Sequence, residues 1–408
     1  MNIWILNHYA LPPDSAGGTR HFDLARRLVA QGHDVTIIAA NTAYMTGQSE
    51  RIPRGYRFAR QLIEGVRFVW VRARPYHGNG LTRLLNMVDY ARHVRQVARH
   101  LPRPSVLVGV AIHHFTGLAA WDLARHYRVP FVFEVGDIWP DTLVDMGISP
   151  RHPAVLLFNL LDRFLLRRAD HVITLLPLSF DRLAQGGAPR ERITLIPNGF
   201  DLGRFPLHET PPSTAHFTAM YAGSHGSANG LETLIRAAQL LSVDPDPVAQ
   251  QVRLLLVGDG PEKAKLEALA VELNVHNVSF EAAVPKAAIA ATLQQADALI
   301  FHLQALAVLV RFGLSPNKLW DYMAAARPVI FACIGGNNPI QEAGAGLSIA
   351  PERPAALAHA LVTLARMPPA ERQRMGLAGR SYVERHHDWD ALTEQFLAVL
   401  QYAVEMHR

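Results

Sequence analysis

The chain of 408 residues and 45.1 kDa is long enough for two domains, and its 49% of hydrophobic residues exclude a disordered protein. Its one cysteine, Cys333, excludes an internal disulfide and a cysteine zinc cluster. The net charge of +5 combines +9 in residues 1–200, which hold 24 arginines against 15 acidic residues, with −4 in residues 201–408. The basic half could meet an anionic substrate, a membrane surface or nucleic acid, or simply carry a solvated arginine-rich surface.

Short apolar runs alternate with helical patterns along the first half of the chain. A strand at 3–6, a helix at 19–31 and a strand at 35–39 open the series. Further strands are predicted at 68–71, 106–110, 131–135, 172–175 and 193–196. This alternation is typical of a mostly parallel sheet with helices on both faces. No apolar run reaches the roughly 20 residues of a spanning helix, and no basic residue precedes the first strand, so we expect a cytoplasmic protein without a secretory signal.

The pattern pauses in the proline-rich run 206–213, which is the best linker candidate, and then restarts. Strands are predicted at 217–221, 253–257, 278–280, 298–301 and 329–331, and helices at 231–241, 261–273, 287–295 and 317–326. We expect an α/β protein with two doubly wound, Rossmann-like domains, 1–205 and 206–385, and a last helix within 386–408 packed on the first domain. Ligands of such sheets lie beyond the carboxyl ends of the strands, so the active site is expected in a cleft that the two domains face.

Three glycine-containing turns follow predicted strands and open predicted helices. Gly17 and Gly18 stand before the first helix beside Arg20, residues 223–230 follow the first strand of the second domain, and Gly258 lies in the third turn. Free N–H groups at a helix N-terminus bind phosphate, and glycine lets the phosphate approach. A turn that merely needs glycine is the alternative, because neither a dinucleotide fingerprint nor a P-loop occurs.

The densest group of candidate residues lies at 313–324. Ser315 can cap a helix that Pro316 begins. Lys318 and Asp321 are three residues apart and therefore share one helix face. The lysine suits a pyrophosphate and the carboxylate suits a ribose diol, whereas an exposed ion pair is the alternative.

Four short sequences contain residue types that bind metal ions, but none of them has the arrangement of a metal site. The two Asp-x-Asp sequences lie in a proline loop at 244–246 and at a helix start at 388–390, where aspartate acts as a cap. The His-His pairs at 113–114 and 386–387 have no third ligand at helical spacing. We therefore expect no metal.

Several motifs occur in one order over essentially the whole chain. They are Gly-Gly-Thr-Arg before the first helix, Pro-Asn-Gly-Phe-Asp at 197–201, Gly-Asp-Gly-Pro at 258–261 and Ser-Pro-Asn-Lys-Leu-Trp-Asp-Tyr-Met-Ala-Ala from Ser315. The order resembles the retaining glycosyltransferases of family four, which have the GT-B fold. Asp-Ile-Trp-Pro-Asp at 137–141 and Ala-Asn-Gly-Leu-Glu-Thr-Leu at 228–234 resemble the bacterial envelope branch of that family, which includes N-acetylfucosaminyl transferases of the WbuB type.

The resemblance implies an enzyme that moves a sugar from a UDP-sugar donor with retention of configuration and without a metal or other cofactor. The implied acceptor is a polyprenyl-diphosphate-linked saccharide at the inner face of the cytoplasmic membrane, in O-antigen, capsule or exopolysaccharide synthesis. An N-acetylated or deoxy hexosamine is a candidate sugar.

The resemblance also implies roles for individual residues. Lys318 and Arg20 would stabilise the leaving pyrophosphate, Asp321 would hold the ribose, and Asp137 would position the acceptor or support the reacting carbon, with a helix cap as its alternative. The other implied donor-binding residues are Gly17, Gly18, Ser224, His225, Asn229, Gly258, Leu314, Ser315 and Asn317.

Three features depart from the family pattern. Gly313 stands where the first glutamate of a Glu-x7-Glu motif is usual, and Gly136 stands where the first domain usually has a histidine. The phosphate loop at 223–230 lacks the usual pair of basic residues.

The stretch 81–101 combines two stripes at helical spacing. One stripe is apolar (Leu84, Val88, Val94, Val97 and Leu101) and the other is basic (Arg92, Arg95 and Arg99). The pattern is compatible with a helix at an anionic membrane surface, and an ordinary solvated face is the alternative.

Two other functions remain open at this point. A GT-B nucleotide-sugar epimerase would bind the same nucleotide and would need no lipid acceptor. A nucleic-acid-binding protein would use the basic half, although no aromatic residues interleave with its arginines as single-strand binding favours.

Overall fold

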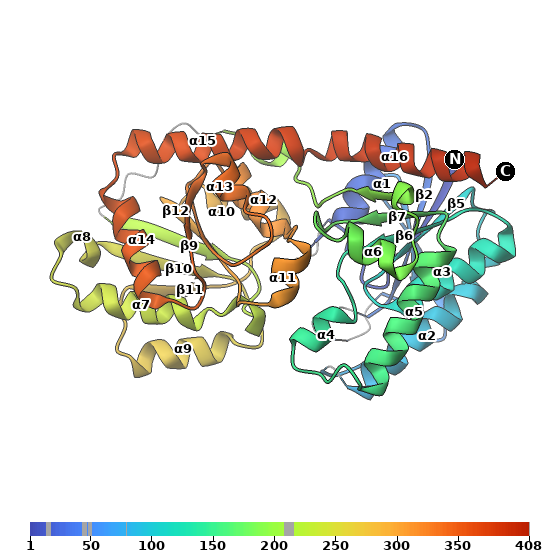
Figure 1. The fold of residues 1–408 in the computed structure, drawn as a ribbon, viewed down its shortest axis with the longest axis horizontal. Coiled ribbons are helices and arrows are strands. Elements are labelled where there is room, and N and C mark those ends of the chain that lie inside the picture. Colours follow the sequence, from blue (N-terminus) through green and yellow to red (C-terminus); the bar gives the residue numbers. More distant parts are fainter. Residues whose placement is uncertain (14–17, 43–46, 48–50, 79, 208–215, 408) are drawn as a thin grey trace. The chain divides into compact units, whose positions relative to one another are not determined.

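The computed structural model describes residues 1–13, 18–42, 47, 51–78, 80–207 and 216–407 (Figure 1). Two compact units divide the chain. The first unit contains residues up to Pro197 together with the segment from Trp389 on, and the second unit contains Asn198–Asp388. The division falls before the proline-rich run 206–213, and most of that run lies outside the described residues.

The first unit is built on one sheet of eight strands in the order β3-β4-β2-β1-β5-β6-β7-β8. Its neighbours pair in parallel except β3 and β4, which form an antiparallel hairpin. The strands are β1 Asn2–Leu6, β2 Asp34–Ala40, β3 Phe58–Ile63, β4 Val66–Val71, β5 Val106–Val110, β6 Phe131–Val135, β7 His171–Thr174 and β8 Ile193–Leu195.

The strand β3 has no counterpart among the predicted strands. It lies at the sheet edge with mostly exposed side chains, so its sequence carries no apolar run. The hairpin turn at Glu64 and Gly65 has positive φ at both residues, 47° and 80°, which suits the tight turn between antiparallel strands.

Helices cover both faces of the first sheet. The chain enters α1 (Arg20–Ala30) after β1, and α3 packs on β5 so closely that a Cβ at Gly109 would lie 2.7 Å from the Cβ of Ala120. The remaining helices of this unit are α2 Leu81–Ala98, α3 His114–Tyr127, α4 Asp141–Asp145, α5 Pro153–Arg168, α6 Phe180–Gly186, the 3₁₀ turn Arg190–Arg192 and α16 Trp389–Met406.

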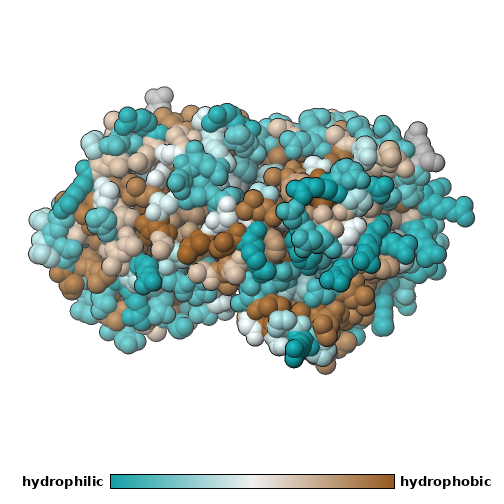
Figure 2. Space-filling model, viewed as in Figure 1, coloured by the Kyte–Doolittle hydropathy of each residue, from teal (hydrophilic) through white to brown (hydrophobic). Residues whose placement is uncertain are grey.

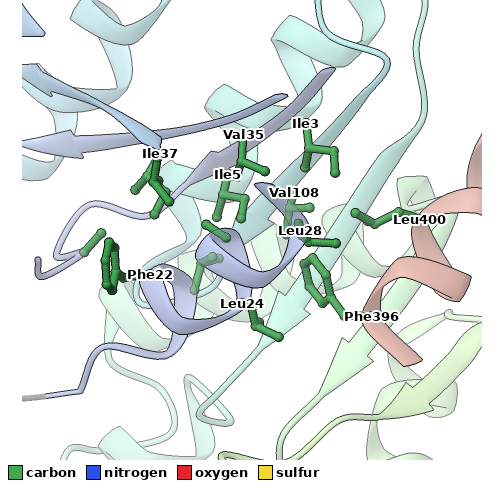
Figure 3. Close-up of a cluster of buried hydrophobic side chains, with 14 of the residues drawn as sticks. Ile3, Ile5, Phe22, Leu24, Leu28, Val35, Ile37, Val108, Phe396 and Leu400 are labelled. Carbon is green, nitrogen blue, oxygen red and sulfur yellow. The ribbon is translucent and has the colours of Figure 1, made fainter. Parts of the chain in front are cut away.

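The last helix, α16, completes the core of the first unit. Figure 3 shows Phe396 and Leu400 of α16 beside Leu28 of α1 and Val108 of β5, and all four are buried in one cluster. The helix that ends the described chain therefore belongs structurally to the strands that begin it.

The second unit contains one parallel sheet of six strands in the order β11-β10-β9-β12-β13-β14. The strands are β9 Phe217–Ala222, β10 Val252–Val257, β11 Val278–Glu281, β12 Ala298–His302, β13 Val329–Ala332 and β14 Gly346–Ile349. The edge strand β14 was not predicted, because only four residues form it and they are mostly half-exposed.

Apolar side chains of the second sheet alternate between two buried clusters, as the pleat requires. One cluster contains α10, α12, α13 and α15, and the other contains α7, α9 and α14. The helices are α7 Glu232–Val243, α8 Pro247–Gln250, α9 Lys263–Glu272, α10 Ile289–Leu293, α11 Ala307–Phe312, α12 Asn317–Ala324, α13 Pro339–Ala343, α14 Pro354–Arg366, α15 Pro369–His386 and the 3₁₀ turns Leu202–Arg204, Ser227–Asn229 and Lys286–Ala288. Two doubly wound α/β domains, as predicted, are confirmed.

Candidate functional site

Two glycine loops meet at the carboxyl ends of β9 and β10 in the second unit. The backbone N–H of Gly223 donates to Val257 O at 2.9 Å, and that of His225 donates to Asp259 O at 2.8 Å. A Cβ at Gly258 would lie 1.9 Å from Gly223 O, and one at Gly260 would lie 2.6 Å from His225 O. Glycine at 258 and 260 is thus required by the close approach of the two backbones, whatever ligand binds there.

Lys318, in the first turn of α12, reaches the first of these loops. Its Nζ donates to Tyr221 Oη at 3.1 Å and to Asn229 Oδ1 at 2.5 Å, and lies 4.8 Å and 5.3 Å from the ring centres of Tyr221 and Phe301. Burial lowers the pKa of Lys318 to about 7. The structure therefore brings the predicted residues Lys318 and Asn229 together. With this pKa, the charged and neutral forms of the lysine are both populated near pH 7.

The loop that receives Lys318 is held from several sides. Tyr221 Oη and Asn229 Nδ2 both donate to Ser224 O, at 2.7 Å and 2.9 Å. Tyr322 Oη accepts from Ala222 N at 2.7 Å and donates to Ala222 O at 2.8 Å, which fixes the end of β9. Ser224 itself is exposed. A loop fixed in this way can present its exposed groups to a ligand without further ordering.

His225 supports the loop from inside. Its side chain is fully buried, and its ring lies 6.1 Å from that of Tyr221 and 6.5 Å from that of Phe280. Neither ring nitrogen has a hydrogen-bond partner within the described residues. Burial, followed by the charge of Lys263, lowers the pKa of His225 and so favours a neutral ring.

Asp321 follows Lys318 by one turn and carries a partner that sequence reasoning missed. Lys286 Nζ lies 2.6 Å from Asp321 Oδ2, and both side chains are largely buried. Lysine is rare in this chain, because only four of the 40 basic residues are lysines. This rarity is a sequence signal that could have drawn attention to Lys286. Three of the four, Lys263, Lys286 and Lys318, bond to these loops or to Asp321, with Lys263 Nζ donating to Gly258 O at 3.0 Å.

The segment before α12 is fixed by hydrogen bonds to residues distant in the sequence. Ser315 Oγ accepts from Asn198 N at 2.9 Å, so the predicted cap by Ser315 is wrong, and α12 begins at Asn317 after Pro316. Leu314 N donates to Asn337 Oδ1 at 2.8 Å. Asn317 is half-exposed at the start of the helix.

Gly313 ends α11 with φ +79°, a conformation that favours glycine. A glutamate in this conformation would be strained. Glycine at position 313 therefore fits the backbone of this chain.

The first unit buries Arg20 in an ionic network. Arg20 Nε and Nη2 donate to the two carboxylate oxygens of Glu134, each at 3.1 Å, and Nη1 and Nη2 donate to the carbonyls of Pro197 and Ile196 at 2.6 Å and 2.9 Å. His21 Nε2 lies 2.8 Å from Glu134 Oε1. Burial alone would raise the pKa of Glu134, but the charges of Arg20 and His21 hold it at about 2. These contacts occupy Arg20 within the protein and weigh against its direct use on a phosphate.

Asp137 follows β6. The residue as a whole is exposed, but burial of its carboxyl group raises its pKa. It does not cap α4, whose cap position is Pro140, and its carboxylate has no hydrogen-bond or ion-pair partner within the described residues. Gly18 is exposed directly before Thr19 and α1, and Gly17 lies outside the described residues. In the part of the chain that is described, no three histidine, cysteine or carboxylate side chains are grouped to hold a metal ion.

Helix α2 buries the C-terminal part of its apolar stripe inside the first unit, whereas Leu84 is 38% exposed. Val94 and Val97 are buried, Leu101 beyond the helix is 9% exposed, and Arg95 pairs with Asp122 at 3.1 Å. The solvated-face alternative is therefore favoured for Arg92, Arg95 and Arg99. Among the described helices, none has the length and apolar character that crossing a bilayer requires.

Both halves of the chain match known glycosyltransferase domain families. Residues 16–199 match the glycosyl transferase 4-like domain, and residues 216–367 match the glycosyl transferases group 1. The chain is 24% identical over 405 residues to the putative colanic acid biosynthesis glycosyl transferase WcaI of Escherichia coli K12, an alignment that covers 92% of this chain and 93% of that protein.

Two solved structures share the fold over almost their whole length. Sucrose-phosphate synthase of Thermosynechococcus elongatus superposes with a TM-score of 0.75 at 20% identity, covering 98% of each chain. Alr3699/HepE of Anabaena, in complex with UDP and glucose, superposes with a TM-score of 0.67 at 17% identity, covering 98% of this chain and 99% of that one.

Proposed function

Since both halves of this chain match glycosyltransferase domains and its fold is GT-B, we propose that it acts on nucleotide sugars in polysaccharide biosynthesis. In the proposed reaction it transfers a sugar from a UDP-linked donor to a lipid-linked saccharide with retention of configuration. The observation that carries the proposal is the placement of Lys318 at the N-terminus of α12, bonded to the glycine loop, with Asp321 one turn later. The pair provides a cation and a helix N-terminus for a pyrophosphate and a carboxylate for ribose hydroxyls.

The proposed reaction breaks the bond between the sugar C1 and the diphosphate oxygen and forms a bond from C1 to the acceptor hydroxyl oxygen on the same face. Negative charge grows on the departing diphosphate, where the Lys318 ammonium and the N–H groups of the loop stabilise it. A leaving phosphate oxygen accepts the proton of the acceptor hydroxyl. Asp137, whose carboxyl group has a pKa raised by burial and no partner within the described residues, would orient that hydroxyl or support the positive charge at C1.

The relatives support the donor class and the pathway. The Anabaena structure holds UDP and glucose, and the Escherichia coli relative is named for colanic acid biosynthesis. A polyprenyl-diphosphate acceptor, an N-acetylfucosaminyl or other hexosamine donor, and a location at the inner membrane face remain predictions from the sequence resemblance.

A panel of UDP-sugars tests the proposal directly. We expect one UDP-sugar to raise the melting temperature and to release UDP faster when a saccharide acceptor is added, and we expect 5 mM EDTA to leave the rate unchanged. Donor consumption that is independent of any acceptor would instead favour an epimerase. Loss of transfer in EDTA with recovery in Mg²⁺ or Mn²⁺ would refute metal independence.

Donor binding is expected to weaken as the pH rises above about 7. The pKa of Lys318 is lowered to about 7 by burial, so the free protein carries the ammonium below this pH and loses it above. A UDP-sugar diphosphate, which does not titrate in this range, binds the charged form better. The Kd for UDP-glucose should therefore rise by about 10- to 150-fold between pH 6 and pH 9.5, the range that a charged hydrogen bond of about 1.5–3 kcal/mol allows.

Isothermal titration calorimetry across this pH range measures the change in Kd. Repeating the titration near pH 8 in buffers of different ionisation enthalpy gives the number of protons that the protein takes up when the donor binds. The Lys318→Met variant is the control and should show a flat profile. An equally flat wild-type profile would show that Lys318 does not titrate with the donor.

A further inference from the structure

Helix α5 (Pro153–Arg168) exposes three large apolar side chains on one face. Leu156, Leu157 and Leu160 have 56%, 46% and 66% of their surface exposed. Figure 2 shows hydrophobic residues gathered at the lower edge of the first unit, where Figure 1 places α4 and the N-terminal end of α5. Leucines exposed to this extent, adjacent on a helix, mark a surface that meets an apolar partner.

The same face becomes basic in the second half of the helix. Arg163, Arg167 and Arg168 are exposed, and none of the three pairs with an acidic group within the described residues. At 1.5 Å per residue, the arginines begin about 5 Å beyond Leu160, so leucines and arginines form one continuous surface. The long arginine side chains can keep their charges in the headgroup layer while their stems cover apolar surface.

The one acidic residue of α5 is withdrawn from this surface. Asp162 is buried on the opposite side, 3.2 Å from Arg182 Nη2 and 3.5 Å from His114 Nε2. Val155, Leu165 and Leu166 share that inward side. The outward face of α5 therefore presents leucines and positive charge without a negative side chain of the same helix.

We propose that the outward face of α5 docks the first unit on an anionic lipid bilayer. Leu156, Leu157 and Leu160 enter the boundary between headgroups and acyl chains, and Arg163, Arg167 and Arg168 bind lipid phosphates. The proposal rests on the proposed function in one respect, that a lipid-linked acceptor is met at a membrane. It assigns this role to α5 in place of the Arg92, Arg95 and Arg99 stripe of α2, whose neighbouring valines are buried.

Vesicle co-sedimentation of the 408-residue chain tests the proposal. The probes are vesicles of phosphatidylcholine with 30% phosphatidylglycerol and vesicles of pure phosphatidylcholine. The triple variants are L156Q/L157Q/L160Q and R163E/R167E/R168E, and R92E/R95E/R99E is the matched control with the same charge change on another helix.

We expect the wild type to prefer the anionic vesicles. Each arginine near an anionic surface strengthens partitioning by about fivefold, so reversing three charges should weaken binding by more than about 100-fold at low salt and by little at 0.5 M salt. The leucine variant should lose binding by about 100-fold or more at both salt concentrations, because burying a leucine depends on apolar area. The α2 control should change binding several-fold less than the α5 charge reversal.

Three results would overturn the proposal: a wild type without preference for anionic vesicles, α5 variants that sediment like the wild type, or an α2 control that loses as much binding as the α5 variants. A fourth result would also overturn it: a dimer in sedimentation equilibrium that the leucine substitutions dissociate, without vesicle binding, would show that a second copy covers this face. Melting temperature and UDP-sugar binding report whether each variant is folded. Transfer to a short water-soluble acceptor should survive in the α5 variants, so a failure of the docking surface is distinguishable from a failure of the proposed transferase function.

Discussion

Replacing Lys318 by alanine is expected to lower kcat/KM for the donor by about 10- to 150-fold. The Nζ of Lys318 is held at Tyr221 and Asn229, over the rings of Tyr221 and Phe301, so it is positioned before a donor arrives. A hydrogen bond to a charged group contributes about 1.5–3 kcal/mol, and this range converts to the stated factor when the bond tightens in the transition state. Steady-state kinetics at pH 6.5, where most of the lysine is charged, provide the measurement.

The chain offers a matched control for this substitution. Lys265 is exposed and pairs with Glu262 at 3.5 Å on the surface of α9, so Lys265→Ala should leave the kinetics unchanged. Asp321→Ala should act mainly on KM, because the carboxylate is assigned to donor binding. Wild-type kinetics in a folded Lys318→Ala protein would remove Lys318 from the reaction.

The second large effect is expected on stability, from Glu134→Ala. The Glu134 carboxylate is buried between Arg20 and His21. Its removal leaves the Arg20 guanidinium buried with two carbonyls, of Ile196 and Pro197, and the ring of Trp389 at 5.7 Å. Breaking a buried pair by deleting one partner costs about 3–5 kcal/mol. For a unit of this size, the melting temperature should fall by about 6–20 °C.

Differential scanning calorimetry at pH 7 measures this change, and the binding of UDP-glucose shows whether the second unit stays folded. The double variant Arg20→Leu with Glu134→Leu should recover part of the loss, because no uncompensated charge remains. A drop of less than about 1 kcal/mol in Glu134→Ala would mean that solvent reaches Arg20. The low pKa of Glu134, about 2, also predicts that this stabilisation persists at pH 7 and is lost as the pH falls from about 4.5 toward 2.

The fold could be predicted because its central strands are short apolar runs. Strands such as β1 and β5 are buried on both faces, so the sequence signal is continuous and unambiguous. The edge strands β3 and β14 escaped prediction because only one neighbour and little burial define them. A strand that pairs on one side only and buries few side chains shows no apolar pattern in its own sequence.

In the candidate site, the features that depend on local spacing could be predicted, and the contacts between distant residues could not. The spacing of Lys318 and Asp321 is local, and a helix at this segment places both on one face. Lys286, by contrast, lies 35 residues from Asp321, and Glu134 lies 114 residues from Arg20, so their pairing depends on how the sheets are assembled. The local sequence favoured Ser315 as a helix cap. Its actual partner, Asn198, lies 117 residues earlier and leaves no local signal.

The apolar stripe of α2 shows the opposite failure, in which a local pattern allows two partners. Val94 and Val97 repeat at helical spacing, which suits a membrane and a protein core equally. The burial of these two valines within the first unit favours the protein core, whereas Leu84 of the same stripe is 38% exposed. The exposed leucines of α5 occur in a run that is apolar almost throughout, so the sequence alone does not distinguish them from core residues.

The packing of α16 on α1 has a consequence for synthesis on the ribosome. The first unit lacks Phe396 and Leu400 until the ribosome has translated all 191 residues of Asn198–Asp388, which takes about 10–40 s at about 5–20 residues per second. During that interval Leu28 and Val108 face an unfilled apolar groove on the nascent chain, which a chaperone can occupy. The second unit can fold meanwhile, so the unit whose synthesis starts first is the last to be completed.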